Sequence, residues 1–424
     1  MDTITSVKGF KDILPSETGK WRFVEQRVRQ VFESFGFQEI RVPIVEKTDL
    51  FRRGIGEATD IVEKEMYTFL DRGDEYLTLR PEATASVIRA YLEHTFYASD
   101  PIAKLYTIGP MFRRERPQKG RFRQFHQIDV EVLGYDDPRI DAELILMLVH
   151  LLKSVGLVEP QLEINSLGCP ECRPAFRKAV VDFLADKVES LCPDCKRRME
   201  ANPLRIFDCK VESCKTVIAG APSLIEFLCD GCRSHFNGVQ EALTLFGIAF
   251  IINPRMVRGL DYYTKTAFEV TTNFLGAQNA IVGGGRYDSL IRDLGGPDIP
   301  GIGFAIGFER LLAVMPSTDA DYETHPALFI AALGAQAQQV AYGLCNRLRL
   351  KGVATEMDYM GKGLKGQMKR ANKLNCRYTL LIGDRELEEK QAVLRDMQNG
   401  SQQNIGMEGI EEEIINIVKR GNKL

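Results

Sequence analysis

The sequence lacks a long hydrophobic run, a strong net charge and, outside one segment, cysteine. Its most apolar stretch, LILMLVHLL at residues 144–152, is too short to span a bilayer. The polar start MDTITSVKGFKD carries no signal-peptide pattern, so we expect a cytoplasmic protein without a membrane partner. The net charge of −3 over 424 residues excludes a generally basic chain of the kind that coats nucleic acid.

Cysteine is concentrated in one segment, since eight of the ten cysteines fall between residues 169 and 232. The pairs CPEC at 169–172, CPDC at 192–195 and CDGC at 229–232 have the spacing of zinc knuckles, and Cys209 with Cys214 could complete a second set of four thiolates. In a cytoplasmic chain this spacing favours metal binding over disulfides. We leave a structural zinc site open and commit to no metal; its first candidate ligands are Cys169, Cys172, Cys192 and Cys195.

Residue composition and secondary-structure patterns divide the chain into a body, an insertion and a C-terminal domain. A helical pattern at 21–35 and β-rich runs such as FQEIRVPIVE predict an α+β body on a largely antiparallel sheet over residues 1–325. A Cys-rich helical insertion interrupts it at 168–245. Strands and helices alternate over 326–424, which predicts a small α/β domain. This domain has 15 Lys and Arg against 11 Asp and Glu, net +4, and that asymmetry suggests an acidic partner.

The stretch FRRERPQKGRFRQFHQIDVE at 112–131 carries a dense basic cluster, with six Lys and Arg between residues 113 and 123. Its simplest structure is an antiparallel hairpin with a basic loop, whose first arm carries Arg113 and Glu115 on one face. On the second arm a period of two places Gln127, Asp129 and Glu131 on one face and apolar residues on the other. Carboxylates and amides alternating beside arginines favour a pocket for a small, partly anionic molecule over a nucleic-acid arm or a solvated surface.

Several independent stretches share a resemblance to one family. RRERPQKGRFRQFHQ resembles motif 2 of the class II aminoacyl-tRNA synthetases, in the form found in the histidyl-tRNA synthetases. GFQEIRVPIVEKTDLF at 36–51 is similar to motif 1 and GIGFAIGFERLL at 301–312 to motif 3. LTLRPEATAS, VRGLDYYT at 257–264 and VGGGRYD at 282–288 resemble the family's amino-acid-binding segments. The resemblance covers nearly the whole chain.

The resemblance implies ATP-dependent activation of L-histidine to histidyl-adenylate, followed by transfer to the 3′ end of tRNA(His), with release of pyrophosphate and AMP. ATP would be a substrate and Mg²⁺ a cofactor. The implied catalytic residues are Arg258 and Arg113. The implied ATP-binding residues are Arg113, Glu115, Arg121 and Arg310. The implied histidine-binding residues are Glu82, Ala83, Thr84, Gln127, Glu131, Arg258, Tyr262 and Tyr263.

The C-terminal domain would be the family's anticodon-binding domain, with Lys362, Lys365 and Lys369 on a basic helical face that contacts tRNA. Motif 1 implies a homodimer. One alternative is the catalytically silent paralogue that acts as the regulatory subunit of ATP phosphoribosyltransferase, although such paralogues lose the phosphate-binding motifs and lack the anticodon-binding domain. A pure RNA-binding module is a third hypothesis, and it leaves the polar pocket unexplained.

Overall fold

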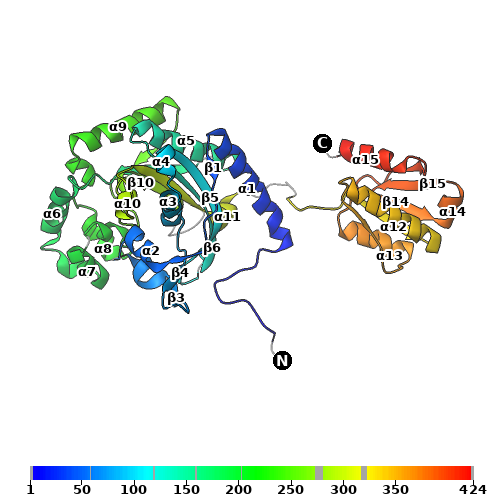
Figure 1. The fold of residues 1–424 in the computed structure, drawn as a ribbon, viewed down its shortest axis with the longest axis horizontal. Coiled ribbons are helices and arrows are strands. Elements are labelled where there is room, and N and C mark those ends of the chain that lie inside the picture. The colour runs from blue at the N-terminus through cyan, green and yellow to red at the C-terminus, as the bar shows by residue number, and fades with distance from the viewer. Residues whose placement is uncertain are drawn as a thin grey trace. The chain divides into compact units, whose positions relative to one another are not determined.

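The computed structural model describes residues 3–57, 59–117, 120–157, 160–201, 203–272, 280–316 and 322–421. The chain forms two compact units, residues 1–321 and 322–424, which are described separately. Both are visible in Figure 1.

An eight-stranded sheet forms the centre of the first unit, in the order β1-β5-β6-β11-β10-β9-β7-β8. Its strands are β1 (Gln38–Glu39), β5 (Ala103–Phe112), β6 (Gln124–Leu133), β7 (Gln161–Ser166), β8 (Ile251–Ile252), β9 (Thr264–Thr271), β10 (Ala280–Arg286) and β11 (Gly301–Gly307). Only β1 with β5 and β7 with β8 pair in parallel. The prediction of an α+β body on a largely antiparallel sheet is therefore confirmed.

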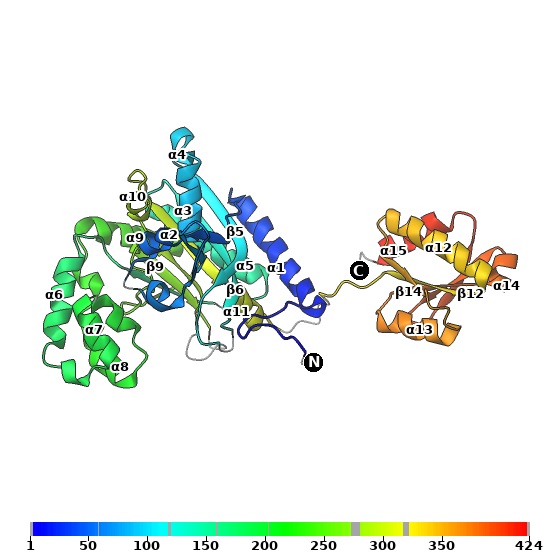
Figure 2. The ribbon, with the colours of Figure 1, turned by 60° about the horizontal axis from the view of Figure 1, so that its bottom comes forward.

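Three long helices cover one face of this sheet (Figures 1 and 2): α1 (Pro15–Ser34), α5 (Pro138–Ser154) and α9 (Asp230–Leu245). Helix α1 buries a stripe that includes Trp21, Val24 and Val28, which confirms the predicted helical period. The alternate side chains of β6, Ile128 and Val130, are fully buried in the same core. The other face of β6 is left for polar groups.

The remaining elements of the body outside the insertion are short. A three-stranded antiparallel sheet, β2-β4-β3, consists of β2 (Val45–Lys47), β3 (Tyr67–Leu70) and β4 (Tyr76–Leu79). The helices here are α2 (Thr48–Ile55), the single π-turn η1 (Ile61–Glu65), α3 (Thr84–Glu93), α4 (Phe96–Ser99), α10 (Leu290–Asp293) and α11 (Phe308–Val314). Strand β11 runs directly into α11, as the sequence GIGFAIGFERLL predicts.

The basic stretch at 112–131 corrects one expectation. Strands β5 and β6 do pair antiparallel, but the ladder ends at Phe112 and Gln124. The N–H of Arg114 donates to Glu65 O at 2.7 Å, and the N–H of Arg123 donates to Gly9 O at 2.8 Å. These bonds to other segments take the chain out of the ladder. Arg113 still pairs across the hairpin, its N–H donating to Arg123 O at 2.8 Å, whereas Glu115 lies on a loop beyond the strand arm.

The Cys-rich segment lies between β7 and β8 and is helical. It contains α6 (Arg173–Leu184), α7 (Pro193–Ala201), α8 (Glu212–Ile218) and the 3₁₀ turns η2 (Val188–Ser190), η3 (Pro203–Asp208) and η4 (Leu224–Phe227), and it ends with α9. Helices α6, α7 and α8 lie side by side in both ribbon views.

The second unit is a mixed five-stranded sheet in the order β13-β12-β14-β15-β16, which confirms the predicted α/β domain. Its strands are β12 (Leu328–Leu333), β13 (Thr355–Met357), β14 (Tyr378–Gly383), β15 (Gln391–Asp396) and β16 (Gln402–Gly406). Its helices are α12 (Ala335–Leu350), α13 (Leu364–Lys373), α14 (Asp384–Glu388) and α15 (Ile410–Gly421). Across both units, none of the described helices has the length and apolar character that crossing a membrane requires.

Candidate active site

A cleft of about 260 Å³ opens on the face of the large sheet opposite α1, α5 and α9. Its floor consists of small residues on β11 and β10, which pair in register: Gly283 lies opposite Ala305. Its walls carry polar residues of the flanking strands, since Gln127 on β6 lies opposite Gly307 and Glu269 on β9 lies opposite Gly283. The alternation that buries Ile128 and its neighbours thus lines a polar cleft on the other face.

Two floor positions need glycine because charged side chains lie directly against them. A Cβ atom on Gly283 would collide with the guanidinium group of Arg258, and one on Gly303 would collide with the carboxylate of Glu131. The glycine-rich segments at 282–288 and 301–307 therefore let charged groups approach the sheet backbone.

One end of the cleft is acidic and aromatic. Glu82, Thr84, Tyr262, Tyr263 and Tyr287 line it. Behind them lies Glu131, 1 % exposed, which accepts hydrogen bonds from Thr84 Oγ1 at 2.6 Å and from the hydroxyl of Tyr287. Glu131 therefore braces the lining without forming part of it, and Ala83 is likewise fully buried.

Burial controls the ionisation of this end. It raises the pKa of the Glu82 carboxyl, and it raises the pKa values of Asp129 and Glu131 well above their usual range. The charge of Glu82 adds to the rise at Asp129. A cation bound among these carboxyls would favour their ionised forms, so this end of the cleft suits an ammonium group.

Four arginines line the rest of the cleft, Arg113, Arg121, Arg258 and Arg310, and Arg258 reaches the aromatic end, where its guanidinium lies 5.4 Å from the centroid of the Tyr263 ring. Arg121 Nη1 lies 2.6 Å from Glu115 Oε2, and Arg258 pairs with Glu269. Arg310 donates from Nη1 to Ala280 O at 2.7 Å. Burial lowers the pKa of Arg310, and the charge of Arg121 lowers it further. An anion at this end would relieve that repulsion.

Several polar atoms of the cleft are buried without a hydrogen-bond partner among the described residues. They include Glu82 Oε2, Gln127 Oε1, Arg121 Nε and Arg258 Nε. An unpaired buried polar atom costs about 1–3 kcal/mol, so such atoms are rare unless a ligand pairs with them. Their gathering at both ends indicates a ligand with polar groups of both signs.

Most residues predicted from the sequence come together in this cleft. Two functional candidates were missed. Tyr287 bonds to Glu131, and its only sequence signal was its place after the three glycines of VGGGRYD. Glu269 pairs with Arg258, and alternation along β9 could have indicated that its side chain leaves the core face.

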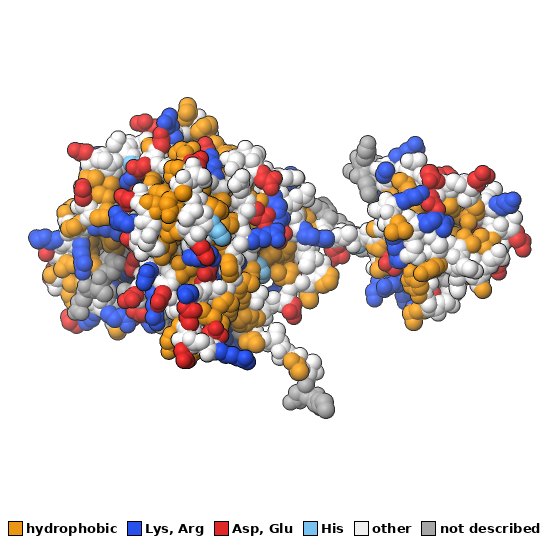
Figure 3. All heavy atoms as spheres, viewed as in Figure 1, with side chains coloured by type: hydrophobic (Ala, Val, Ile, Leu, Met, Phe, Trp, Pro, Cys, Tyr) orange, Lys and Arg blue, Asp and Glu red, His pale blue; other side chains and the backbone are white. Residues whose placement is uncertain are grey.

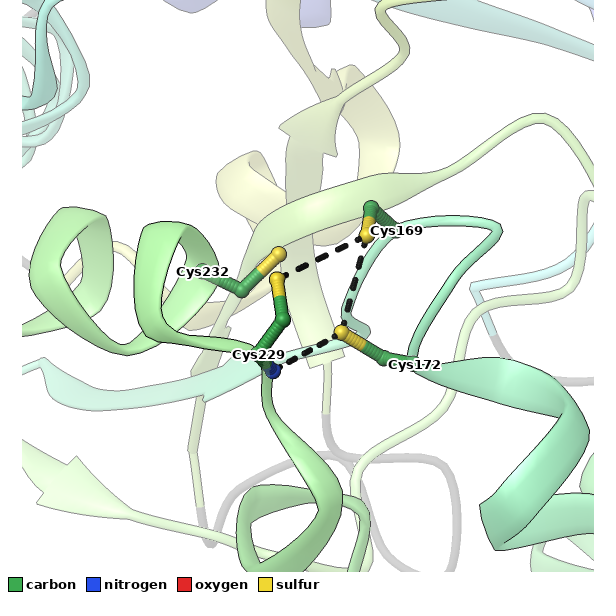
Figure 4. A group of neighbouring side chains, drawn as sticks. All are labelled: Cys169, Cys172, Cys229 and Cys232. Atoms are coloured by element: carbon green, nitrogen blue, oxygen red, sulfur yellow. Dashed lines mark hydrogen bonds between the residues drawn. The ribbon is translucent and has the colours of Figure 1, made fainter.

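Eight of the ten cysteines lie outside the cleft in two groups of four, each with its sulfurs within 4.8 Å of one another. Group 1 is Cys169, Cys172, Cys229 and Cys232, shown in Figure 4. Group 2 is Cys192, Cys195, Cys209 and Cys214. The candidate ligands named from the sequence are thus divided between two groups and do not form one site. Sequence spacing cannot decide which pairs meet.

In the second unit, Lys365 and Lys369 are exposed on α13, and Lys362 is exposed just before it. The opposite face of α13 buries Gln367 and Ala371 against the sheet. The three lysines therefore share a solvent-facing basic surface.

Comparison with known proteins gives consistent matches. The histidyl-tRNA synthetase family model matches residues 9–171 and 214–311, and an anticodon-binding-domain model matches 327–417. The histidine–tRNA ligase of Geobacter sulfurreducens is 57 % identical over 399 residues, which is 94 % of this chain and 96 % of that protein. That of Syntrophotalea carbinolica is 53 % identical and covers 99 % of this chain and 100 % of its own.

Among solved structures, the histidyl-tRNA synthetase of S. aureus superposes with a TM-score of 0.82 at 37 % identity, covering 97 % of this chain and 99 % of that one. The cleft, the order of the motifs and these matches agree: the chain belongs to the histidyl-tRNA synthetase family of the class II aminoacyl-tRNA synthetases.

Proposed function

We propose that the cleft of this histidine–tRNA ligase forms histidyl-adenylate from L-histidine and ATP, and then transfers histidine to the 3′ end of tRNA(His). The first step releases pyrophosphate and the second releases AMP. The observation that carries the proposal is that one cleft is lined both by buried carboxyls and by four arginines. The ammonium group of an amino acid is positive and suits the carboxyls, whereas the phosphates of a nucleoside triphosphate are negative and suit the arginines.

The arginine-rich end would bind ATP and stabilise the transition state. When the histidine carboxylate attacks the α-phosphorus, two anions approach and negative charge builds on the phosphate. Arg258 and Arg113 would act there, because a guanidinium stays charged and offers a planar fork of donors. Arg113 is held from behind, with Nε donating to Pro81 O at 2.9 Å. No general base is needed, since the attacking carboxylate is already ionised.

The other ATP contacts would come from Arg121 and Arg310, with Glu115 fixing Arg121. Mg²⁺ would be held by the ATP phosphates together with carboxylate oxygens, and Glu115 and Glu269 supply such oxygens in the lining. The ion would neutralise phosphate charge.

The acidic end would bind histidine. Glu82 and Thr84 would take the α-ammonium group, and Gln127 and Tyr262 the rest of the amino-acid head. A neutral imidazole offers one donor and one acceptor, and we assign its recognition to Tyr263 and Glu131. Because Glu131 lies behind Thr84 and Tyr287, it would read the ring through these side chains or after they turn aside. Buried polar groups reject analogues that leave them unpaired.

The basic surface of Lys362, Lys365 and Lys369 would bind the anticodon arm of tRNA(His), since backbone phosphates are attracted to exposed lysines.

A second copy of the chain would pack around motif 1. There a groove of about 890 Å³ lies between residues 40–53 and α3. Ile44 within that segment and Leu70 on β3 of the three-stranded sheet are 42 % and 52 % exposed. Hydrophobic side chains also show at the surface around β3 and β4 in Figure 3. Ten free thiols fit the cytoplasmic location expected from the sequence.

The alternative is the regulatory paralogue of ATP phosphoribosyltransferase. Five residues that such a paralogue would not need, Arg113, Arg121, Gln127, Arg258 and Arg310, line one cleft here. This disfavours the alternative.

A paired assay tests the proposal. Pyrophosphate exchange into ATP should depend on histidine alone among the amino acids, and Arg258→Ala should slow it by about 10²-fold or more while histidine binding weakens less. Lys365→Glu with Lys369→Glu should leave exchange unchanged and raise the KM for tRNA, whereas Arg385→Glu, on the same unit, should change neither. Absence of exchange with every amino acid would favour the paralogue, and an unchanged rate would remove Arg258 from its role.

A further inference from the structure

The sulfurs of both cysteine groups lie at the spacing that a tetrahedral metal site needs. Cys169 Sγ lies 3.6 Å from Cys172 Sγ and 3.8 Å from Cys229 Sγ, and Cys192 Sγ lies 3.8 Å from Cys209 Sγ. Four sulfurs at 2.3 Å from a zinc ion, at tetrahedral angles, are about 3.8 Å apart. A disulfide would bring two sulfurs to about 2.05 Å, and all eight cysteines are free.

Backbone donors already point at two of the sulfurs. The N–H of Cys229 donates to Cys172 Sγ at 3.2 Å (Figure 4), and the N–H of Cys192 donates to Cys214 Sγ at 3.2 Å. Such N–H groups stabilise thiolates, the form that binds metal. One such N–H to sulfur hydrogen bond lies in each group, which indicates that both groups are preformed for a metal ion.

The insertion also needs support beyond its own apolar packing. Its tip consists of α7, η3 and α8, which are nine, six and seven residues long. Pieces this small rarely hold together by hydrophobic burial alone, and metals commonly supply the missing stability. Group 2 joins the ends of these three elements.

Group 2 is connected to the cleft through two arginines that lie between its cysteines. Arg205 Nη2 donates to Gly259 O at 2.7 Å, and Arg205 Nε lies 3.6 Å from Asp261 Oδ1. Arg198 Nη1 donates to Arg205 O at 3.2 Å and so supports it. Gly259 directly follows Arg258, which makes the Arg205 contacts a direct brace on the loop that carries Arg258.

We propose that each cysteine group binds one Zn²⁺ as a structural ion, and that the group 2 ion holds Arg205 as a positioning residue for the Arg258 loop. The positioning role rests on the proposed function, while the metal sites do not. The family model matches residues 9–171 and 214–311, so most of group 2 lies in the segment that it leaves out. Arg205, which makes the brace, also lies in that unmatched segment.

Metal analysis of the full-length protein, purified without chelator or nickel resin, tests the sites. We expect two zinc ions per chain, about one in Cys195→Ser and in Cys172→Ser, and two in the control Cys345→Ser, whose buried thiol lies in the second unit. Zinc displaced from the wild-type protein by a mercurial reagent gives the same count without any variant that must fold. Fewer than about 1.5 zinc ions per wild-type chain would overturn the proposal.

Amide exchange and kinetics test the brace. In Cys195→Ser, amide hydrogen exchange should become faster at 257–263 and stay unchanged in β7; unchanged exchange at 257–263 despite loss of one zinc would overturn the link. Arg205→Ala should lower the kcat of pyrophosphate exchange about tenfold and change the KM for histidine less than about threefold.

The matched control for the kinetic test is Arg197→Ala. Arg197 lies on α7 and contacts Asp194 of the same helix, and we expect wild-type kinetics from this variant. An equal loss in Arg197→Ala, or none in Arg205→Ala, would contradict the positioning role. If the wild-type protein showed no histidine-dependent pyrophosphate exchange, the proposed function would be refuted. The zinc count and the amide hydrogen exchange would still decide whether the metal sites and the Arg205 brace exist.

Discussion

Glu131 lies in an environment far from that of a free side chain. It is 1 % exposed and accepts hydrogen bonds from Thr84 and Tyr287, while burial raises its pKa well above the usual range. Because the folded protein holds the proton more tightly than the unfolded chain, Glu131 favours the folded state at low pH. That contribution is fully present below the ordinary glutamate value of 4.5 and is lost as pH rises through the raised folded value.

We therefore predict that ligand-free wild-type protein loses more stability than Glu131→Gln as pH rises from 4.5 toward neutrality. Glutamine keeps the shape of the side chain and cannot ionise. Denaturant midpoints at several pH values would measure the difference. Parallel curves for the two proteins would show that Glu131 does not titrate in this way.

Sequence patterns predicted the composition of the cleft better than the contacts within it. The period of two along β6 placed Gln127 on the polar face, because strand geometry fixes that face. The pattern could not show that Tyr287, 156 positions away in sequence, bonds to Glu131. Contacts of this range depend on sheet order, and spacing along one strand does not reveal it.

A buried ion pair joins three elements of the body. Arg286 at the end of β10 and Asp141 on α5 are both fully buried, with Nη2 of Arg286 2.8 Å from Asp141 Oδ1. His235 on α9 brings Nε2 to 2.8 Å from the other oxygen of Asp141. The strand that carries the glycine floor is thereby fixed to two of the helices on the far face.

We predict that Arg286→Met lowers the free energy of unfolding by about 3–5 kcal/mol, because it leaves Asp141 buried with only His235 as partner. Arg292→Met is the control, because the side chain of Arg292 also makes ion pairs but is 55 % exposed. This variant should change the free energy of unfolding by about 0.5 kcal/mol or less. Urea denaturation followed by circular dichroism would measure both. Equal midpoints for the two variants would contradict the assigned role of the buried pair.

Element boundaries show where local pattern fails. The sequence predicted a hairpin across 112–131, and the two strands do pair as far as the bond between Arg113 and Arg123, but bonds of Arg114 to Glu65 and of Arg123 to Gly9 end the pairing there. Both partners lie far away in sequence, and the turn residues Pro117 and Gly120 could not indicate them. In the second unit, by contrast, local alternation predicted most strands and helices, because strands and helices follow one another along the chain there.

At the scale of the whole molecule, the proposed dimer can be tested by sedimentation. We predict that the wild-type protein sediments at twice the mass of one chain, and that Leu70→Glu shifts it toward the monomer by placing charge in the apolar surface near motif 1. Leu350→Glu, at an 87 % exposed leucine of the second unit, should leave the mass unchanged. A monomeric wild-type protein would exclude this dimer.

Group 1 also has a consequence for how the insertion can vary. Its four cysteines come from the segment just after β7 and from the start of α9, so the part of the insertion between them, residues 173–228, begins and ends at nearly the same point. A segment whose two ends are fastened together can change in length or content without shifting the strands on either side. Changes in the length of the segment between the two cysteine pairs thus need not shift β7 or α9, as long as Arg205 keeps its contacts to the loop of Arg258.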